Sequence, residues 1–546
     1  MFNRARFNLF LFSVIFTLNF FTIKLKCDEA VDEVVFEEII NDTAASEINN
    51  ETSSPSHINN ETVVFEHSKV WQHVQKIAQD TVVQIFVDTA SFNWQEPYKT
   101  PKQRKTCGSG FFINAQGLIV TNYHVIDEAA GIKIQIPSLG KEQFKVTVVG
   151  VSPDRDIALL KVSNTAFKMI KQRLGRMPYL KLGNSDLVFR AQEIMALGYP
   201  LGQEKLKSTQ GIVSGREMIL DESYIQMTAA LNPGNSGGPS LNTAGEVIGI
   251  NTARVATAQG VGYVIPINDV KNVIQHLLEI KFLRKPILGC EFNYSTKNTT
   301  NFLSNPLPGG FYVSRVYKDT LLEKAGVKSG DMIYEINGHK IDMYGEMNVS
   351  WSEDKIPVAA LLNRFRLDQK IDLIIYRNGE QNNINLKFEL SDPLPIRFYY
   401  PDYETIDYEI IGGMVIMQLT LNHLEKFSSE NPYLVKYLKR QNQYTPRLII
   451  THIFPTSKTQ DARVVCESDL IKKVNGQPVN TLEELRNEIK KSENYLSIET
   501  SEKQFMVLPF NKIILDEQRL SKKFFYKKTN LIKELLEMRN LKNAES

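Results

Sequence analysis

The stretch that decides the fold of this chain is Asn232-Pro233-Gly234-Asn235-Ser236-Gly237-Gly238-Pro239, which holds one serine between glycines. Glycine reaches backbone conformations that a β-carbon forbids, so consecutive N–H groups in such a loop can converge on one point. The loop is therefore predicted to present Ser236 as a nucleophile, with the N–H groups of Gly234 and Ser236 donating to an oxyanion. The same residue types also build ordinary surface turns, so the prediction depends on finding a general base and a carboxylate upstream.

Both groups are present upstream. His124 lies in the stretch 117–126, where an apolar run ends in a polar turn, which places an imidazole at a strand end. The other seven histidines lie in polar, helix-like or isolated strand contexts that favour surface or structural roles. Asp156 comes directly before the apolar run Ile157–Val162, and a buried aspartate needs a partner. Asp154 is the better candidate for a turn or capping role.

The chain order of His124, Asp156 and Ser236 is that of the chymotrypsin-like double β-barrel. Several further stretches resemble, in the same order, the motifs of the Deg/HtrA serine proteases. The resembling stretches are Cys107–Ile113, Thr121–Val125, Asp156–Leu159, Leu197–Gly202, Gly211–Ser214, Asn232–Pro239, Gly249–Thr252 and Gly262–Pro266. The resemblance runs from about residue 70 to residue 280.

The resemblance implies a role for each of these residues. His124 is the general base and then the general acid, Asp156 orients it, and Ser236 attacks the peptide carbonyl. The oxyanion hole that it implies is formed by the N–H groups of Gly234, Asn235 and Ser236. One position departs from the family, because Thr228 stands where members usually carry an aspartate. We expect altered loop packing there more than lost catalysis.

The sequence also indicates the chemical character of the substrate pocket. Ala230 and Leu231 are expected to line it, and neither carries a charge. An apolar pocket rejects Lys or Arg, because a buried unpaired charge is costly, and accepts small or medium aliphatic side chains. Cleavage after Val, Ala, Leu or Ile is therefore expected.

Length and composition exclude several classes of protein. The 546 residues, with 42% hydrophobic content, are enough for about three to four domains. The net charge of +2 gives no reason to expect a nucleic acid partner. The four cysteines lie far apart without metal-type spacing, so neither a zinc site nor a disulfide framework is expected. The sequence has no GxxxxGK[ST] loop, which would bind the phosphates of ATP. No cofactor is expected.

Residues 1–27 are predicted to be a signal peptide, with a basic start and the apolar run Phe7–Phe21. The alternative is a membrane anchor, but that run is shorter than the roughly 20 residues needed to span. Membrane attachment is expected only if the leader is uncleaved. Residues 28–66 are predicted to be an acidic, disordered linker. The location would be the periplasm in a bacterium, or a secretory or organellar lumen in a eukaryote.

The predicted fold class is mostly β: a double β-barrel protease domain over 67–283, followed by two PDZ-like α+β domains. The protease domain is expected to begin with a helix over about 67–79 and a strand over 81–87. In the family this N-terminal region joins protease domains, so the resemblance implies a homotrimer or a larger assembly.

The first PDZ-like domain is predicted over 284–391. The stretches Ile287–Phe292, Gly310–Val316 and Leu322–Gly338 closely resemble a PDZ domain, and Asn337-Gly338 is a strong hairpin signal. Such domains bind an extended chain, often an apolar C-terminus, by adding it to a sheet edge. The residues expected to bind it are Leu288, Gly289, Cys290, Glu291 and Phe292. The alternative is a docking module that binds no peptide.

A second and more degraded copy is predicted over 392–510. Pro446–Ile453 and Asp469–Val479 repeat the pattern, but the flanking glycines are missing. A domain specialised for packing is favoured over a second peptide reader. The resemblance is to the Deg subgroup with a divergent second PDZ domain. Residues 511–546 are expected to be a Lys-rich helical tail, either solvated or docked.

The predicted function is an ATP-independent serine endopeptidase that degrades unfolded or damaged proteins outside the cytoplasm. The expected partners are unfolded protein substrates and apolar C-terminal peptides, and the resemblance implies activation by such peptides. The alternative is a PDZ-bearing chaperone or scaffold whose protease is latent or inactive. A regulated protease with one signalling substrate would carry the same sequence features.

Overall fold

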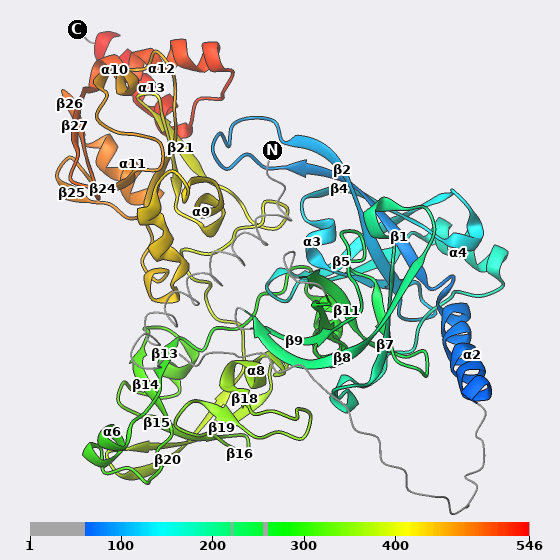
Figure 1. Cartoon of the computed structure of the whole chain (residues 1–546). Helices are drawn as coiled ribbons and strands as arrows, with labels where there is room; N and C mark the ends of the chain where they lie inside the picture. The colour runs from blue at the N-terminus through cyan, green and yellow to red at the C-terminus, as the bar shows by residue number, and fades with distance from the viewer. Residues whose placement is uncertain (1–59, 220–221, 255–259, 545–546) are drawn as a thin grey trace, which may run out of the picture.

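The computed structural model describes residues 60–219, 222–254 and 260–544. Along the chain, a pair of barrels is followed by two units that each contain one main sheet and several helices. In Figure 1 the barrels lie at the right, the first sheet unit at the lower left and the second at the upper left. The leader expected over 1–27 and most of the expected linker lie outside the described residues. No helix within these ranges is long and apolar enough to cross a membrane.

The first barrel closes through six antiparallel strands in the order β1-β2-β3-β6-β5-β4. The strands are β1 (Val82–Ser91), β2 (Lys102–Phe112), β3 (Leu118–Thr121), β4 (Ala129–Gln135), β5 (Gln143–Ser152) and β6 (Ile157–Val162). All side chains of β6 except Lys161 are buried. Because apolar residues occupy both faces of β6, this strand lies inside the molecule, and Asp156 before it lies at the barrel edge.

The second barrel has the strand order β10-β11-β12-β9-β8-β7. Its strands are β7 (Glu193–Gly198), β8 (Lys207–Ile219), β9 (Glu222–Met227), β10 (Pro239–Leu241), β11 (Val247–Arg254) and β12 (Gly262–Pro266). Helix α5 (Ile267–Glu279) then returns to the first barrel. It approaches β5 so closely that a Cβ on Gly150 would lie 2.2 Å from the carbonyl oxygen of Leu277. The double β-barrel predicted from the motifs is confirmed.

Helix α2 (Asn60–Ala78) precedes the barrels and packs Trp71 and Val74 into their common core. Because α2 begins at Asn60, residues 60–66 are helical, and the linker expected through residue 66 is shorter than predicted. Short helical segments fill the other connections of the barrels: α3 (Tyr123–Ile126), η1 (Pro137–Leu139), η2 (Pro153–Arg155), α4 (Asn164–Leu174), η3 (Ser185–Leu187) and η4 (Pro200–Gly202).

The first sheet unit has the strand order β13-β14-β15-β19-β20, with β16 paired to β15. Its strands are β13 (Cys290–Asn293), β14 (Phe311–Val316), β15 (Met332–Ile336), β16 (His339–Lys340), β19 (Lys370–Arg377) and β20 (Glu380–Lys387). A separate ribbon joins β17 (Glu346–Met347) to β18 (Ile356–Pro357). The helices are α6 (Lys297–Phe302), α7 (Leu321–Lys324) and α8 (Val358–Asn363). In this order β13 lies at the edge of the sheet.

The second sheet unit repeats this order and adds one strand at the edge, giving β21-β22-β23-β24-β26-β27 with β25 paired to β24. Its strands are β21 (Tyr408–Ile411), β22 (Met414–Gln418), β23 (Leu448–Ile453), β24 (Leu470–Val474), β25 (Gln477–Pro478), β26 (Tyr495–Thr500) and β27 (Phe505–Pro509). The helical segments are α9 (Leu421–Phe427), η5 (Pro432–Leu438), η6 (Arg440–Asn442), α10 (Lys458–Ala462), α11 (Leu482–Lys490), α12 (Phe510–Phe524) and α13 (Asn530–Ala544).

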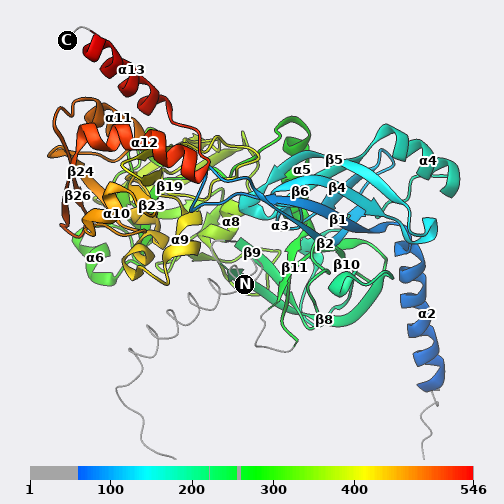
Figure 2. The same ribbon diagram turned by 90° about the horizontal axis from the view of Figure 1, so that it is seen from above.

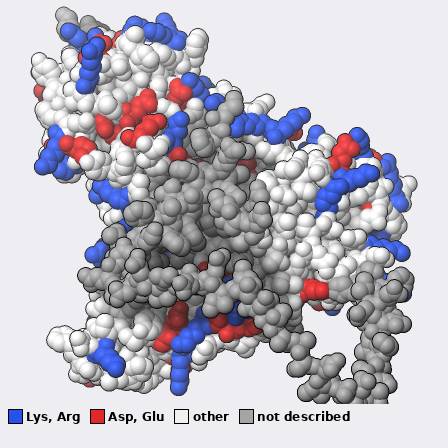
Figure 3. Space-filling view, viewed as in Figure 1, with Lys and Arg blue, Asp and Glu red and all other residues white. Residues whose placement is uncertain are grey.

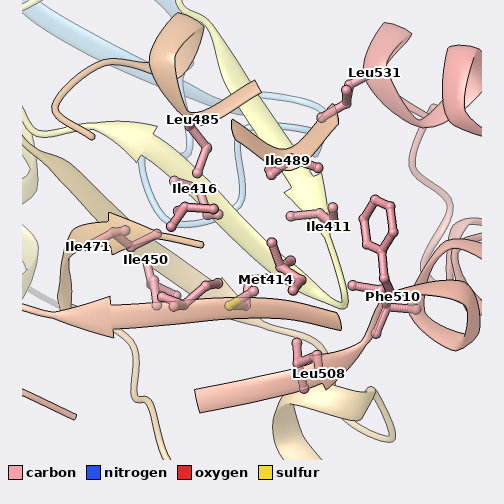
Figure 4. Packing of buried hydrophobic residues seen from close by; sticks show 14 of the residues in the cluster. Ile411, Met414, Ile416, Ile450, Ile471, Leu485, Ile489, Leu508, Phe510 and Leu531 are labelled. Carbon is pink, nitrogen blue, oxygen red and sulfur yellow. The ribbon is translucent and has the colours of Figure 1, made fainter. Parts of the chain in front are cut away.

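The residues expected to form a Lys-rich tail pack with this second unit. Figure 4 shows Phe510 of α12 and Leu531 of α13 beside Ile411 and Ile489, which belong to the strands and helix of the unit. Ile513 and Ile514 of α12 are fully buried in the same cluster. The apolar faces of α12 and α13 therefore complete the core of the domain.

The surface carries no dominant charge on the face that Figure 3 shows. Lys and Arg are interspersed with Asp and Glu over the described part of that face, in line with the net charge of +2. Seen from above, α2 extends from the barrels at one end of the molecule, and α13 extends from the second sheet unit at the other (Figure 2). The barrels and the two sheet units therefore form an elongated body with helices at both ends.

Candidate active site

The two barrels bring together the three residues expected to form a catalytic triad. His124 lies in α3 directly after β3, and Asp156 follows the turn η2 before β6. Ser236 lies in the loop between β9 and β10. The Nδ1 atom of His124 is 2.8 Å from Oδ2 of Asp156 and 3.1 Å from Oδ1. The imidazole and the carboxylate are therefore paired as a Ser-His-Asp mechanism requires.

Asp156 is oriented by further hydrogen bonds and by its backbone. The main-chain N–H of His124 donates to Oδ1 (2.9 Å), and the hydroxyl of Thr252 donates to Oδ2 (2.9 Å). Asp156 has a φ of +53°, which is uncommon for a residue with a side chain, and its N–H donates to the carbonyl of Pro153 (3.1 Å). Thr252 was not singled out from the sequence, although it closes the motif Gly249–Thr252.

The hydroxyl of Ser236 points toward β11 in this structure. Its Oγ donates to the carbonyl oxygen of Thr252 (3.0 Å), and no hydrogen bond joins it to His124 within the described ranges. Catalytic hydrogen bonds are often long or misaligned without substrate and tighten only in the complex with substrate. The Ser236 hydroxyl must leave the carbonyl of Thr252 before the imidazole can take its proton.

The loop around Ser236 is held mainly by its backbone. The N–H of Ser109 donates to the carbonyl of Ser236 (2.9 Å), and the Ser109 hydroxyl donates to the carbonyl of Gly234 (2.6 Å). Gly237 has a φ of +84°, and a Cβ there would lie 2.1 Å from the carbonyl oxygen of Ser109. Only glycine fits at that position. Ser109 is fully buried, and its supporting role was missed from the sequence because nothing local marks it.

The expected oxyanion hole is only partly available in this structure. The N–H of Asn235 donates to the carbonyl of Asn232 (2.9 Å), so the expectation that it points into the hole is wrong for this conformation. This hydrogen bond closes a turn in which the N–H of Asn235 points away from the expected oxyanion hole. The N–H groups of Gly234 and Ser236 have no acceptor in the part of the chain that the structure describes. These two donors, which the loop composition alone predicted, remain available for an oxyanion.

The residues expected in the substrate pocket differ in exposure. Leu231 is 7% exposed and packs in an apolar cluster, and a Cβ on Gly262 would lie 3.2 Å from its side chain. Ala230 is exposed, and its carbonyl accepts from the hydroxyl of Thr209 (2.9 Å). Thr228, at the position where the family usually has an aspartate, accepts from the N–H of Ile212 (2.9 Å). The Thr228 hydroxyl thus supports local strand packing.

The electrostatic setting of His124 favours its protonated form. Burial opposes the positive charge, but the neighbouring Asp156 carboxylate outweighs it and raises the pKa of His124 above its ordinary value. The side chain of His124 is still 38% exposed and can reach substrate. A general base with a raised pKa holds its proton to a higher pH and needs a higher pH to act.

This raised pKa predicts the pH dependence of hydrolysis. Because His124 must be neutral to accept a proton, kcat/KM should fall as the pH drops through the pKa of His124. We expect the acidic limb to lie above the ordinary histidine value of about 6.5. The measurement is kcat/KM for a fluorogenic peptide between pH 5 and pH 9. A limb at or below pH 6 would contradict the raised pKa.

The five residues expected to bind a peptide lie at the start of the first sheet unit. Cys290, Glu291 and Phe292 belong to β13, which pairs with β14 and has no partner strand on its other edge among the described residues. Leu288 and Gly289 lead into it. Gly289 has a φ of +83°, and a Cβ there would lie 2.1 Å from the side chain of Thr320. The five residues therefore follow an open sheet edge.

The corresponding edge of the second sheet unit is already occupied. Strand β21 pairs with β22 along its length, from Tyr408 opposite Met417 to Ile411 opposite Met414. Arg486 of α11 contacts both carboxylate oxygens of Asp407 (2.7 and 2.8 Å), just before β21. The chain itself thus fills the position at which an added strand would bind.

Comparison with known proteins agrees with this arrangement. The family model of the trypsin-like peptidase domain matches residues 108–250, and that of the PDZ domain matches residues 401–525. A probable periplasmic serine endoprotease DegP-like of Marinomonas sp. (strain MWYL1) is 31% identical over 343 residues, 61% of this chain and 67% of that protein. The periplasmic serine endoprotease DegP of Escherichia coli (strain K12) is 33% identical over 293 residues, 52% of this chain and 57% of that protein.

Among solved structures, the HtrA-type protease AlgW with decapeptide is 26% identical, with 59% of this chain and 99% of that chain covered and a TM-score of 0.46. The PDZ match falls on the second sheet unit, whose sequence pattern is the more degraded of the two. The chain spans about two thirds of the Marinomonas protein and little more than half of the Escherichia coli protein. An identity of 31% across two thirds of a relative is enough to establish kinship, and the chain therefore belongs to the Deg/HtrA family of serine proteases, with a trypsin-like domain and a PDZ domain.

Proposed function

We propose that this protein is an exported, ATP-independent serine endopeptidase that degrades unfolded or damaged proteins. The observation that carries the proposal is the hydrogen bond between His124 and Asp156. Thr252 contacts both ends of the site, because its hydroxyl donates to Asp156 and its carbonyl accepts from the hydroxyl of Ser236. One strand residue thus links the expected nucleophile to the expected acid. The relatives are named as periplasmic serine endoproteases, which supports both the reaction and the export.

The chemistry follows from these contacts. Ser236 turns from Thr252 to the imidazole, which takes its proton as Oγ attacks the substrate carbonyl carbon. Asp156 stabilises the imidazolium that forms. The N–H groups of Gly234 and Ser236 donate to the developing oxyanion, and each such donor is worth about 100- to 1,000-fold in rate.

The second half of the reaction reuses the same groups. His124 gives its proton to the leaving amine as the C–N bond breaks, which leaves an acyl group on Ser236. Water then loses a proton to His124 and attacks the acyl carbon. The acid departs, the proton returns to Ser236, and the site is restored.

We expect cleavage after small or medium aliphatic residues, because Ala230 and Leu231 offer no charge to pair with Lys or Arg. The discrimination against Lys or Arg should be about 100-fold or more in kcat/KM. A peptide-library digest measures it, with the variant Ala230→Asp as the matched comparison. Ala230 is exposed and can accept a carboxylate, which should raise cleavage after Lys and Arg. Digests dominated by cuts after Lys or Arg in the unchanged protein would contradict the expected pocket.

The two sheet units are proposed to divide their tasks. The first, over 284–391, has the open β13 edge and would bind apolar C-terminal peptides that activate the protease. The second, over 392–510 and extended by α12 and α13, fills its own edge with β21 and would act in packing. This division fits the Deg subgroup with a divergent second PDZ domain. Assembly into a homotrimer or larger oligomer is a further proposal that rests on the family.

A chaperone or scaffold with a latent protease is the second candidate. Two observations favour it: the hydroxyl of Ser236 is turned to Thr252, and the N–H of Asn235 is held by Asn232. The same digest separates the two functions when it is run with and without an apolar C-terminal peptide. Cleavage that the peptide stimulates supports a protease that rests in this conformation. No cleavage in either condition would favour the chaperone.

A further inference from the structure

The segment between the two sheet units passes between the first barrel and the second sheet unit. We call residues 396–404 the strap. At one end, Ile396 is fully buried in a cluster of the second sheet unit. Farther along, Tyr400 and Tyr403 pack against the core of the first barrel. The strap therefore contacts the barrel that carries the base and the acid of the proposed triad.

An aromatic contact links the strap to the loop of the base. The ring of Tyr400 lies edge-on to the ring of Tyr123, with 5.3 Å between their centroids. Tyr123 is buried, and it directly precedes His124. Its N–H donates to the carbonyl of Asp156 (3.2 Å). A shift of the Tyr123 backbone would therefore move both His124 and Asp156.

Phe282 adds further aromatic contacts between the strap and the barrel. Phe282 lies 5.7 Å from the ring of Tyr400 and stacks on Tyr403 at 5.0 Å with nearly parallel planes. Contacts of this kind contribute about 0.5–1.5 kcal/mol each beyond the area they bury. The strap is thus fixed to the barrel by several rings from different parts of the chain.

A polar contact links the strap to the turn of the acid. Arg284 donates to Glu404 (2.6 Å) and to the carbonyl of Phe398 (3.1 Å), both in the strap. The same guanidinium lies 3.8 Å from Asp154, which is in the turn η2 directly before Asp156. The side chain of Arg284 is only 17% exposed, so solvent screens its attraction to these carboxylates weakly.

The far side of the strap is anchored as well. The loop between β1 and β2 inserts Trp94 into the same cluster as Ile396, and Trp94 is 8% exposed. Gln95 of that loop donates to Glu467 of the second sheet unit (2.6 Å). The first barrel and the second sheet unit therefore hold the strap between them.

We propose that the strap is a positioning element for catalysis, in which Tyr400 supports the loop of His124 and Arg284 supports the turn of Asp156. Neither residue touches the reacting atoms, so both are positioning residues. The strained φ of Asp156 needs such support from surrounding structure. The proposal deepens the proposed protease function and rests on it.

The test compares Tyr400→Ala, Tyr400→Phe and Arg284→Gln in the full chain, with Tyr433→Ala as control because Tyr433 is 66% exposed on the second sheet unit. A fluorophosphonate probe counts active sites, so that kcat is expressed per competent site. Tyr400→Ala should lower kcat about 10- to 100-fold with KM changed less than about twofold. Its acidic limb should move to lower pH, because His124 loses contact with Asp156 and its pKa falls.

The other variants complete the test. Tyr400→Phe keeps the ring and should restore both kcat and the acidic limb, and Tyr433→Ala should match the unchanged protein. If Tyr400→Ala does not fold, Arg284→Gln must show the loss of kcat and the same shift. Folded variants with unchanged kcat and acidic limb overturn the proposal. Inactivity of the unchanged protein would instead refute the proposed function.

Discussion

Replacing Ser236 by alanine is expected to abolish hydrolysis of unfolded casein, with kcat falling by about a millionfold. The substitution removes the only atom proposed to attack the carbonyl. The loop should keep its shape, because the hydrogen bonds from Ser109 go to main-chain carbonyls that alanine retains. The measurement is casein hydrolysis over time, with circular dichroism and thermal unfolding to check the fold.

The matched control for this prediction is Ser521→Ala in α12. Ser521 lies on α12 of the second sheet unit, and its hydroxyl donates locally to the carbonyl of Gln518 (3.2 Å). The control should hydrolyse casein at the rate of the unchanged protein. If Ser236→Ala retained more than a few per cent of the activity, another nucleophile would have to be responsible.

The second large effect is expected for Asp156→Asn, which should lower kcat about 10,000-fold. Donors from His124 and Thr252 converge on the two carboxylate oxygens. An amide has one oxygen and one NH₂ group, so it cannot accept all of these bonds and would favour the wrong imidazole tautomer. The measurement is kcat for a fluorogenic peptide at saturating concentration across pH 6 to pH 9.

The control for the acid is Asp319→Asn, because Asp319 is 73% exposed on the first sheet unit. It should leave kcat unchanged. A loss of less than about tenfold in Asp156→Asn would show that this carboxylate does not orient the base. Substitution of Asp154 would be a poor control, since that residue contacts Arg284 and the strap.

The double barrel and the residues placed in the triad could be predicted because their signals are local. Each of His124, Asp156 and Ser236 lies in a short run whose residue types and chain order are informative without knowledge of distant contacts. The N–H groups of Gly234 and Ser236 could likewise be predicted from the glycines around the serine.

The supporting residues could not be predicted, because their roles depend on contacts between distant segments. Ser109 meets the carbonyl of Gly234 across 125 positions of sequence, and Thr252 meets Asp156 across 96. A serine in a strand or a threonine after asparagine carries no local sign of such a partner. The same reason hid the contact between Tyr400 and Tyr123.

The C-terminal helices show a different limit of sequence reasoning. Residues 511–546 are rich in lysine. Ile513, Ile514 and Leu520 nevertheless recur at helical spacing on one buried face of α12. Composition therefore favoured a separate tail, whereas the periodicity fits a helix that packs on a core.

The pairing of β21 with β22 depends on the hairpin at Gly412 and Gly413, which both have positive φ.

The most direct test of the central claim is the reaction of the full chain with a fluorophosphonate, followed by peptide mapping with mass spectrometry. A serine activated by His124 should form one covalent phosphonyl adduct, on Ser236. The adduct should be absent from Ser236→Ala and should form far more slowly in Asp156→Asn. No adduct on the unchanged protein, with or without an apolar C-terminal peptide, or an adduct on a different serine, would contradict the account.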